Sequence, residues 1–256
     1  MTKKIQQAFG TWPSVISAEL ITKAAPSLNF LQSHGDNLYW VEGRPWDAGR
    51  SVIMRRDSQG QISDLLPSRY SHYSKVHEYG GMAYAIDDTH LYFVNAADQR
   101  IYQLPLNTDK KPVAITAAGP RFADLVIDQA RQQLIAVCEI HYDDREPENT
   151  IVSIGIGSGS GVDSGINNDM VTTIASGADF YAYPRISPDQ NKLCWIEWQH
   201  PNMPWDSTQL WQANITADGL SDKMLVAGST SNKSPEAIFQ PTWSHDNQLY
   251  YVSDKN

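Results

Sequence analysis

Hydrophobic runs separated by short polar turns recur along this chain. A strand-like run, a turn that contains Asp and a second run that begins with Leu occur five times, at 30–43, 84–96, 124–140, 184–198 and 241–254. The second runs begin at Leu38, Leu91, Leu134, Leu193 and Leu249. This irregular spacing of roughly fifty residues is the length of one four-stranded blade of a β-propeller.

The composition of the runs and turns supports this interpretation. The second runs, such as LYFVNA and LCWIEW, are rich in aromatic and β-branched residues, as expected for strands packed between blades. The turn at 187–190, Ser-Pro-Asp-Gln, reverses the chain readily because Pro presets φ and Asp bonds nearby amides. Long amphipathic helices are nearly absent. We expect an all-β fold, a partial β-propeller of four-stranded antiparallel blades, with about four blades plus an incomplete end. Residues 1–27 are expected to form an N-terminal extension, and residues 28–256 the blades, incomplete at the C-terminus.

Charge and cysteine content narrow the function classes. The net charge of −9 argues against nucleic-acid and anionic-membrane partners, which need a basic surface. Cys138 and Cys194 each lie in an apolar run, which predicts two buried free thiols. The sequence shows neither a signal-peptide pattern nor an apolar run long enough to span a membrane, so a cytoplasmic protein is expected. The Gly/Ser stretch at 157–165 is expected to form a solvated loop in the third blade.

Three motifs go beyond a generic propeller: FGTWPSVISAEL (9–20), VHEYGGMAYAIDD (76–88) and EWQHPNMPWD (197–206). Together with the repeats they resemble the N-terminal portion of bacterial serine peptidases of the prolyl oligopeptidase family, which includes dipeptidyl and acylaminoacyl peptidases. The resemblance implies a propeller that gates peptide access to a C-terminal α/β-hydrolase domain with a Ser-Asp-His triad.

That catalytic domain is not recognisable in these residues. We find no Gly-x-Ser-x-Gly nucleophile turn and no alternating strand–helix pattern. The sequence therefore predicts a region truncated before the catalytic domain, with no catalytic residues, no cofactor and no enzymatic activity of its own.

Two candidate substrate-facing residues, Glu78 and Tyr79, precede the glycine pair Gly80-Gly81. Paired glycines allow a positive φ or a close approach to a neighbouring backbone. In one interpretation Glu78 faces the central cavity and holds the free amine of a peptide. In the other, which the residues favour, Glu78 pairs with an Arg between blades.

The second set of candidates, Trp198, Asn202, Trp205 and Asp206, comes from a loop stiffened by two prolines. This loop is expected either to form a lip that contacts the substrate passage or the hydrolase domain, or to pack locally against the adjacent blade. The scattered histidines do not show a zinc-binding spacing, so no metal is expected.

Alternatives to the peptidase hypothesis remain open. The chain could be a freestanding Tol-type propeller that acts as a protein-interaction scaffold, or, with less support, a metal-dependent lactonase-like propeller. Under the peptidase hypothesis the partners are short peptides or the missing α/β-hydrolase domain, with no nucleic acid and no membrane. An incomplete propeller also leaves an apolar face and strand edges open, which predicts marginal stability or self-association.

Overall fold

The computed structural model describes residues 6–22, 25–156, 171–217, 219–229 and 235–255. The Gly/Ser loop expected at 157–165 lies outside the described residues. Within these ranges the regular elements are strands, apart from one short α-helix, α1 (Ala18–Thr22), and one 3₁₀ turn, η1 (Val76–Glu78). None of the described helices is long and apolar enough to cross a membrane.

The strands form four four-stranded sheets and one two-stranded sheet, each antiparallel and ordered as in the chain. In chain order they are β1 (Ser27–His34), β2 (Asn37–Arg44), β3 (Arg50–Arg56), β4 (Ile62–Asp64), β5 (Tyr84–Ile86), β6 (His90–Val94), β7 (Ile101–Pro105), β8 (Val113–Ala114), β9 (Arg121–Asp128), β10 (Gln133–Ile140), β11 (Glu148–Gly155), β12 (Val171–Ala175), β13 (Phe180–Ile186), β14 (Lys192–Trp198), β15 (Gln209–Thr216), β16 (Gly219–Gly228), β17 (Ile238–Trp243) and β18 (Leu249–Ser253). The expected architecture of four blades plus an incomplete end is confirmed.

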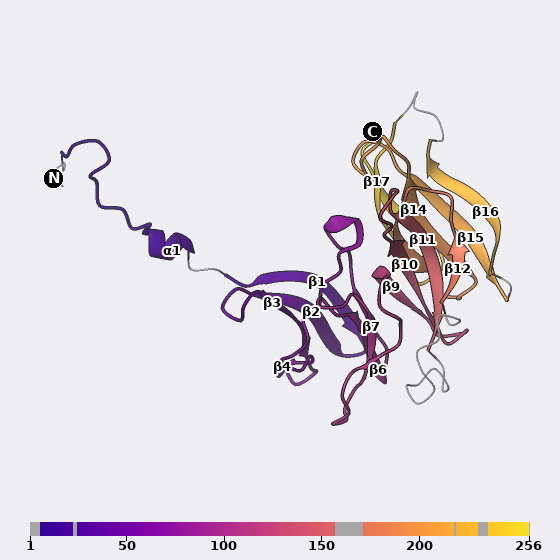
Figure 1. Ribbon diagram of the computed structural model, residues 1–256, viewed down its shortest axis with the longest axis horizontal. Helices are drawn as coiled ribbons and strands as arrows, with labels where there is room; N and C mark the ends of the chain where they lie inside the picture. The colour runs from indigo at the N-terminus through magenta and orange to yellow at the C-terminus, as the bar shows by residue number, and fades with distance from the viewer. Residues whose placement is uncertain (1–5, 23–24, 157–170, 218, 230–234, 256) are drawn as a thin grey trace.

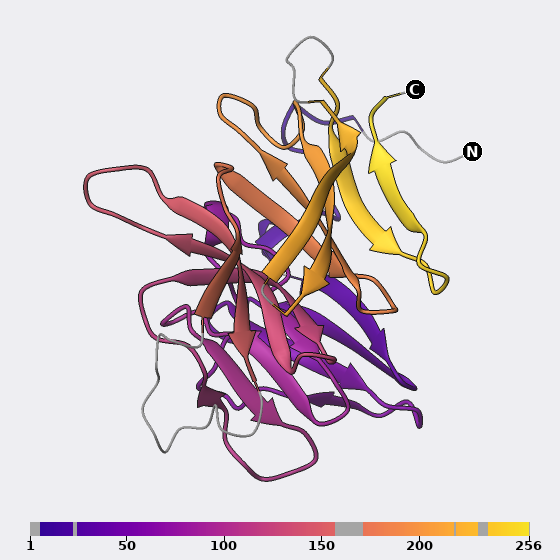
Figure 2. The same cartoon turned by 90° about the vertical axis from the view of Figure 1, so that its right-hand side faces the viewer.

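The sheets succeed one another around a common centre. In Figure 2 the chain runs from the violet first sheet at the lower right, through magenta and salmon, to the orange and yellow strands at the upper right. The first strands of neighbouring sheets touch in series, β5 with β9, β9 with β13 and β13 with β17. The first strand of each blade is therefore the innermost. The N-terminal segment that carries α1 extends away from the sheets (Figure 1).

The apolar core is divided into layers that lie between consecutive blades. In β6, Leu91 and Phe93 pack toward the first blade, whereas Tyr92 and Val94 pack toward the third. Successive side chains of a strand point to opposite faces, so a strand covered on both faces needs apolar residues at nearly every position. This requirement explains why the Leu-led second runs are continuously hydrophobic.

The cysteines follow the same rule. Cys138 contributes to the layer between the second and third blades and Cys194 to the layer between the fourth and fifth. Both are free and buried, as predicted, and burial raises the pKa of each thiol to about 12.

Candidate functional site

Four of the five innermost strands share a backbone irregularity. In β1, β9, β13 and β17 the pairing register shifts, so that two residues lie opposite one residue of the next strand. The first residue of each bulge has a left-handed φ, at Phe30 (54°), Asp124 (52°), Tyr183 (54°) and Gln240 (50°). Residues other than glycine seldom adopt this conformation. All four side chains line one cavity, so the bulge presents one residue per blade to the centre.

This axial cavity has a volume of about 650 Å³ and lies where the innermost strands meet. Its walls are mainly aromatic and aliphatic. The aromatic side chains are Phe30, Tyr79, Tyr183, Trp198, Trp205 and Phe239. A concave apolar site with a few polar groups is the usual form of a small-molecule or peptide site.

Asp124 is a buried carboxylate in the wall of the axial cavity, only 6% exposed. Its two oxygens accept hydrogen bonds from the backbone N–H of Met82 (3.0 Å) and of Tyr183 (2.8 Å), which belong to the blades on either side. Asp124 therefore ties three blades together at the centre. Burial, with the charge of Asp124 as a second cause, raises the pKa of Tyr79 and raises that of Tyr183 to about 12.

Gly80 and Gly81 show the two features expected of paired glycines, a positive φ and a close approach to neighbouring chain atoms. Gly80 has a φ of +80°, and a Cβ added there would lie 2.7 Å from the Ser74 carbonyl oxygen. A Cβ on Gly81 would lie 3.0 Å from Asp124 Oδ1 and 3.2 Å from the Ala123 Cβ. One glycine thus supplies the left-handed turn and the other allows the close approach of two blades.

A second, smaller pocket of about 230 Å³ lies beside the axial cavity, and we call it the side pocket. His77 lines both cavities. Its ring packs against Phe180 and Trp198, and its buried Nε2 has no hydrogen-bond partner among the described residues. The ionisable lining of the side pocket is His77, Glu78, Glu139, His141, Glu146, Asp179 and His200.

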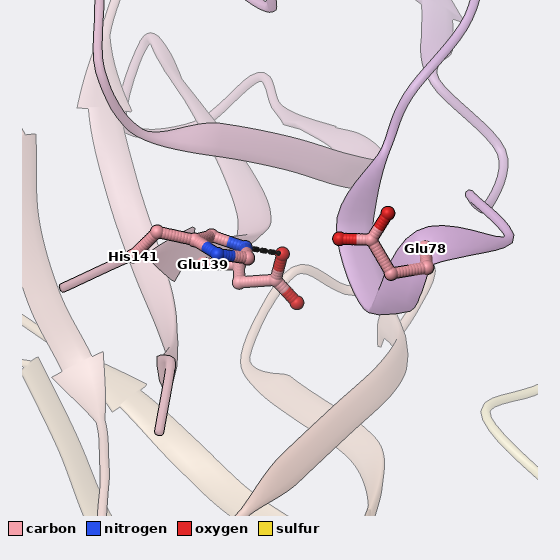
Figure 3. Close-up of side chains that lie close together, drawn as sticks. All are labelled: Glu78, Glu139 and His141. Atoms are coloured by element: carbon pink, nitrogen blue, oxygen red, sulfur yellow. Dashed lines mark hydrogen bonds and ion pairs between the residues drawn. The ribbon is translucent and has the colours of Figure 1, made fainter. Parts of the chain in front are cut away.

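Glu78, Glu139 and His141 cluster at the side pocket (Figure 3). His141 Nε2 lies 2.6 Å from Glu139 Oε1, and one ligand atom from each residue falls within 4.8 Å of the others, as in a metal site. However, Arg121 Nη1 lies 2.5 Å from Glu78 Oε1 and 3.3 Å from Glu139 Oε1. The guanidinium already supplies positive charge between the two carboxylates, and its hydrogen bond lowers the pKa of Glu78.

The structure brings three of the predicted residues together. Tyr79, Trp198 and Trp205 line the axial cavity, but Trp198 is the buried last residue of β14 rather than part of the loop. Trp205 is 67% exposed where it lines this cavity. Glu78 lines the side pocket instead of the central cavity, because Arg121 of the next blade holds it there.

Asn202 and Asp206 do not line either cavity. Asn202 donates its side-chain amide to the Gln199 carbonyl oxygen (3.3 Å), and Asp206 accepts the backbone N–H of Met203 (2.9 Å). Both stabilise the turn that carries Trp205.

Sequence reasoning missed Asp124, Arg121 and Glu139. Glu139 is the last residue but one of the apolar run LIAVCEI, and a carboxylate in such a run signals a buried, paired charge. Asp124 and Arg121 carry no comparable signal, because their partners lie far away in the sequence.

No family model and no curated protein matches the chain. Among solved structures, a Mycobacterium tuberculosis puromycin-hydrolysing peptidase is 30% identical with a TM-score of 0.83, and covers 98% of this chain. A puromycin hydrolase is 27% identical with a TM-score of 0.82 over 95% of the chain. The chain spans only 39% and 38% of these two proteins. A prolyl endopeptidase, 12% identical with a TM-score of 0.59, covers 89% of this chain, which spans 32% of it, and shows the fold alone.

Proposed function

Taking as premise that this chain corresponds to the propeller part of the prolyl-oligopeptidase-type serine peptidases, we propose that it admits short peptides to a catalytic α/β-hydrolase domain. We propose that this domain lies outside these residues, and the resemblance supports that proposal. The observation that carries the proposal is the match over 98% of the chain to 39% of a peptidase. The free, buried thiols of Cys138 and Cys194 are consistent with the reducing cytoplasm that we propose as its location.

The two cavities favour a compact ligand with an apolar body and a free amine. The aromatic walls of the axial cavity suit apolar side chains. The adjoining side pocket contains four carboxylates, on Glu78, Glu139, Glu146 and Asp179. Tyr79 and Glu78 are consecutive residues that face the two cavities, so a peptide in the axial cavity can extend its amine toward Glu78.

The test compares the 256 residues alone with the complete gene product. The chain alone should give only background hydrolysis of aminoacyl-nitroanilides, and turnover that serine-reactive phosphonates abolish would contradict the proposal.

In the complete protein, Glu78→Gln should raise KM about tenfold for a free aminoacyl substrate, because a charge-assisted hydrogen bond is lost. It should leave KM for the N-acylated substrate unchanged.

Glu146→Gln is the matched comparison, since it removes the same charge from the same pocket, and it should raise KM for the free aminoacyl substrate less than Glu78→Gln does. Equal KM changes for the free and the N-acylated substrate in Glu78→Gln would overturn the amine-binding role. A gene that continues through further repeats into a Gly-x-Ser-x-Gly segment supports the peptidase; a gene without one supports the Tol-type scaffold.

A further inference from the structure

The turn that carries Glu78 and Tyr79 has an unfavourable backbone. His77 and Glu78 are consecutive non-glycine residues with left-handed φ values of 53° and 65°, and Gly80 follows at 80°. Such conformations persist only where the surroundings over-determine them, and they concentrate at functional sites. The turn also separates the two cavities, because His77 lines both, Tyr79 the axial cavity and Glu78 the side pocket.

Two residues of the next blade, Glu139 and Arg121, form several hydrogen bonds to this turn. Glu139 of β10 is 3% exposed, and its Oε2 accepts the backbone N–H of His77 at 2.8 Å. Arg121 of β9 donates from Nη1 to the Lys75 carbonyl oxygen (2.9 Å), to Glu78 Oε1 (2.5 Å) and to Glu139 Oε1 (3.3 Å). One backbone donor and one backbone acceptor of the turn are thus fixed by a neighbouring sheet.

From these contacts we infer that Glu139 is a positioning residue that, with Arg121, holds the left-handed His77–Glu78 turn and so directs Glu78 and Tyr79 into their separate cavities. Glu139 is too buried to be the principal ligand contact, and its carboxylate is occupied by His77, His141 and Arg121. The carboxylates of Glu78 and Glu139 face the single guanidinium of Arg121. Leaving His141 aside, these three groups carry one net negative charge, which can attract a cationic ligand. The inference rests on the proposed function and specifies how that site is held.

The experiment uses Glu139→Gln and Glu139→Asp in the complete protein, with Glu146→Gln as the matched control. Gln keeps the length and an acceptor but loses the charge, whereas Asp keeps the charge but is too short to reach the His77 N–H. Both substitutions should raise KM for the free aminoacyl-nitroanilide about tenfold, with kcat within about twofold and KM for the N-acylated substrate unchanged. Glu146→Gln should leave the hydrogen exchange of the His77 and Gly80 amides the same as in the parent.

Amide hydrogen exchange in the complete protein gives a readout that does not depend on catalysis. The His77 and Gly80 amides should exchange at least tenfold faster in both Glu139 variants, while the β10 amides remain protected. Faster exchange throughout β10 with an unchanged ratio of the two KM values would show a purely structural role and overturn the inference. If Glu78→Gln leaves that ratio unchanged but His77 exchange still rises, the amine-binding proposal fails and the positioning of the turn stands. Protected His77 and Gly80 amides in both variants would overturn the positioning.

Discussion

His72 is a titratable side chain enclosed by the core. It is 2% exposed and contacts the rings of Phe30 and Tyr84, and within the part of the chain that the structure describes its Nδ1 has no hydrogen-bond partner. Burial lowers the pKa of His72 from 6.5 to about 4, and burial also lowers the pKa of His77. Between pH 6.5 and 4 the unfolded chain therefore binds more protons than the folded chain, so stability falls as the pH falls.

We expect His72→Phe to flatten this pH dependence. The shift of His72 corresponds to about 3 kcal/mol of unfolding free energy lost between pH 6.5 and 4. Carboxylates with lowered pKa values, such as Asp64, reduce the unfolding free energy only when the pH falls to near their ordinary pKa of 3.8. The loss of stability in the upper part of the range from pH 6.5 to 4 therefore comes from the histidines. Urea unfolding at pH 6.5 and 5 should show a smaller difference in His72→Phe than in the parent, while exposed His245→Phe retains the parent's difference. An unchanged slope in His72→Phe would contradict the assignment.

The bulges of the innermost strands illustrate which features sequence patterns reveal. Leu-led second strands were predictable because a strand covered on both faces must be apolar at successive positions. The bulges could not be predicted, because pairing with the next strand and packing between blades impose them. The residues at these positions have the same backbone conformation but unrelated side chains: Phe30, Asp124, Tyr183 and Gln240. The role of Glu139 in holding the His77–Glu78 turn could not be predicted for a related reason. Glu139 accepts the backbone N–H of His77, which is 62 residues away in the chain.

Gln240 allows the strain of a bulge to be measured, because its side chain is exposed. A β-branched residue is least tolerant of a positive φ, so Gln240→Val should lower the unfolding free energy by about 1–2 kcal/mol. Gln240→Gly should leave stability unchanged or raise it slightly, since glycine adopts this φ without strain. Thr242→Val, at an exposed and regularly paired position of the same strand, should change it little. Urea denaturation measures all three, and equal effects of Val at 240 and 242 would exclude strain at the bulge.

At the scale of the molecule, the two ends of the arc present apolar surface. On the last sheet Tyr250 and Val252 are 60% and 57% exposed, and on the first sheet Leu28 and Leu31 are 66% and 70% exposed. In the described part of the chain no core layer joins the first sheet to the last. Burial of such surface is worth roughly 25 cal/mol per Å², so these faces favour association when nothing else covers them.

We therefore expect the 256 residues alone to self-associate through these faces. Tyr250→Lys combined with Val252→Lys should shift sedimentation toward the monomer, because two charges would have to be buried in the contact. Met224→Lys, at an exposed site on the outer strand β16, should sediment like the parent. A parent chain that remains monomeric at every concentration would disprove the expectation.

The layered core also bears on how the protein is made. Apart from Val76, which enters the layer between the third and fourth blades, each layer uses side chains from two blades that are adjacent in the chain. A blade therefore needs mainly the one synthesised just before it to bury one of its faces. Most contacts thus form between segments that leave the ribosome in succession, and loop closure between them is inexpensive. Blades can therefore stack onto the growing arc in the order of translation, each serving as the template for its successor.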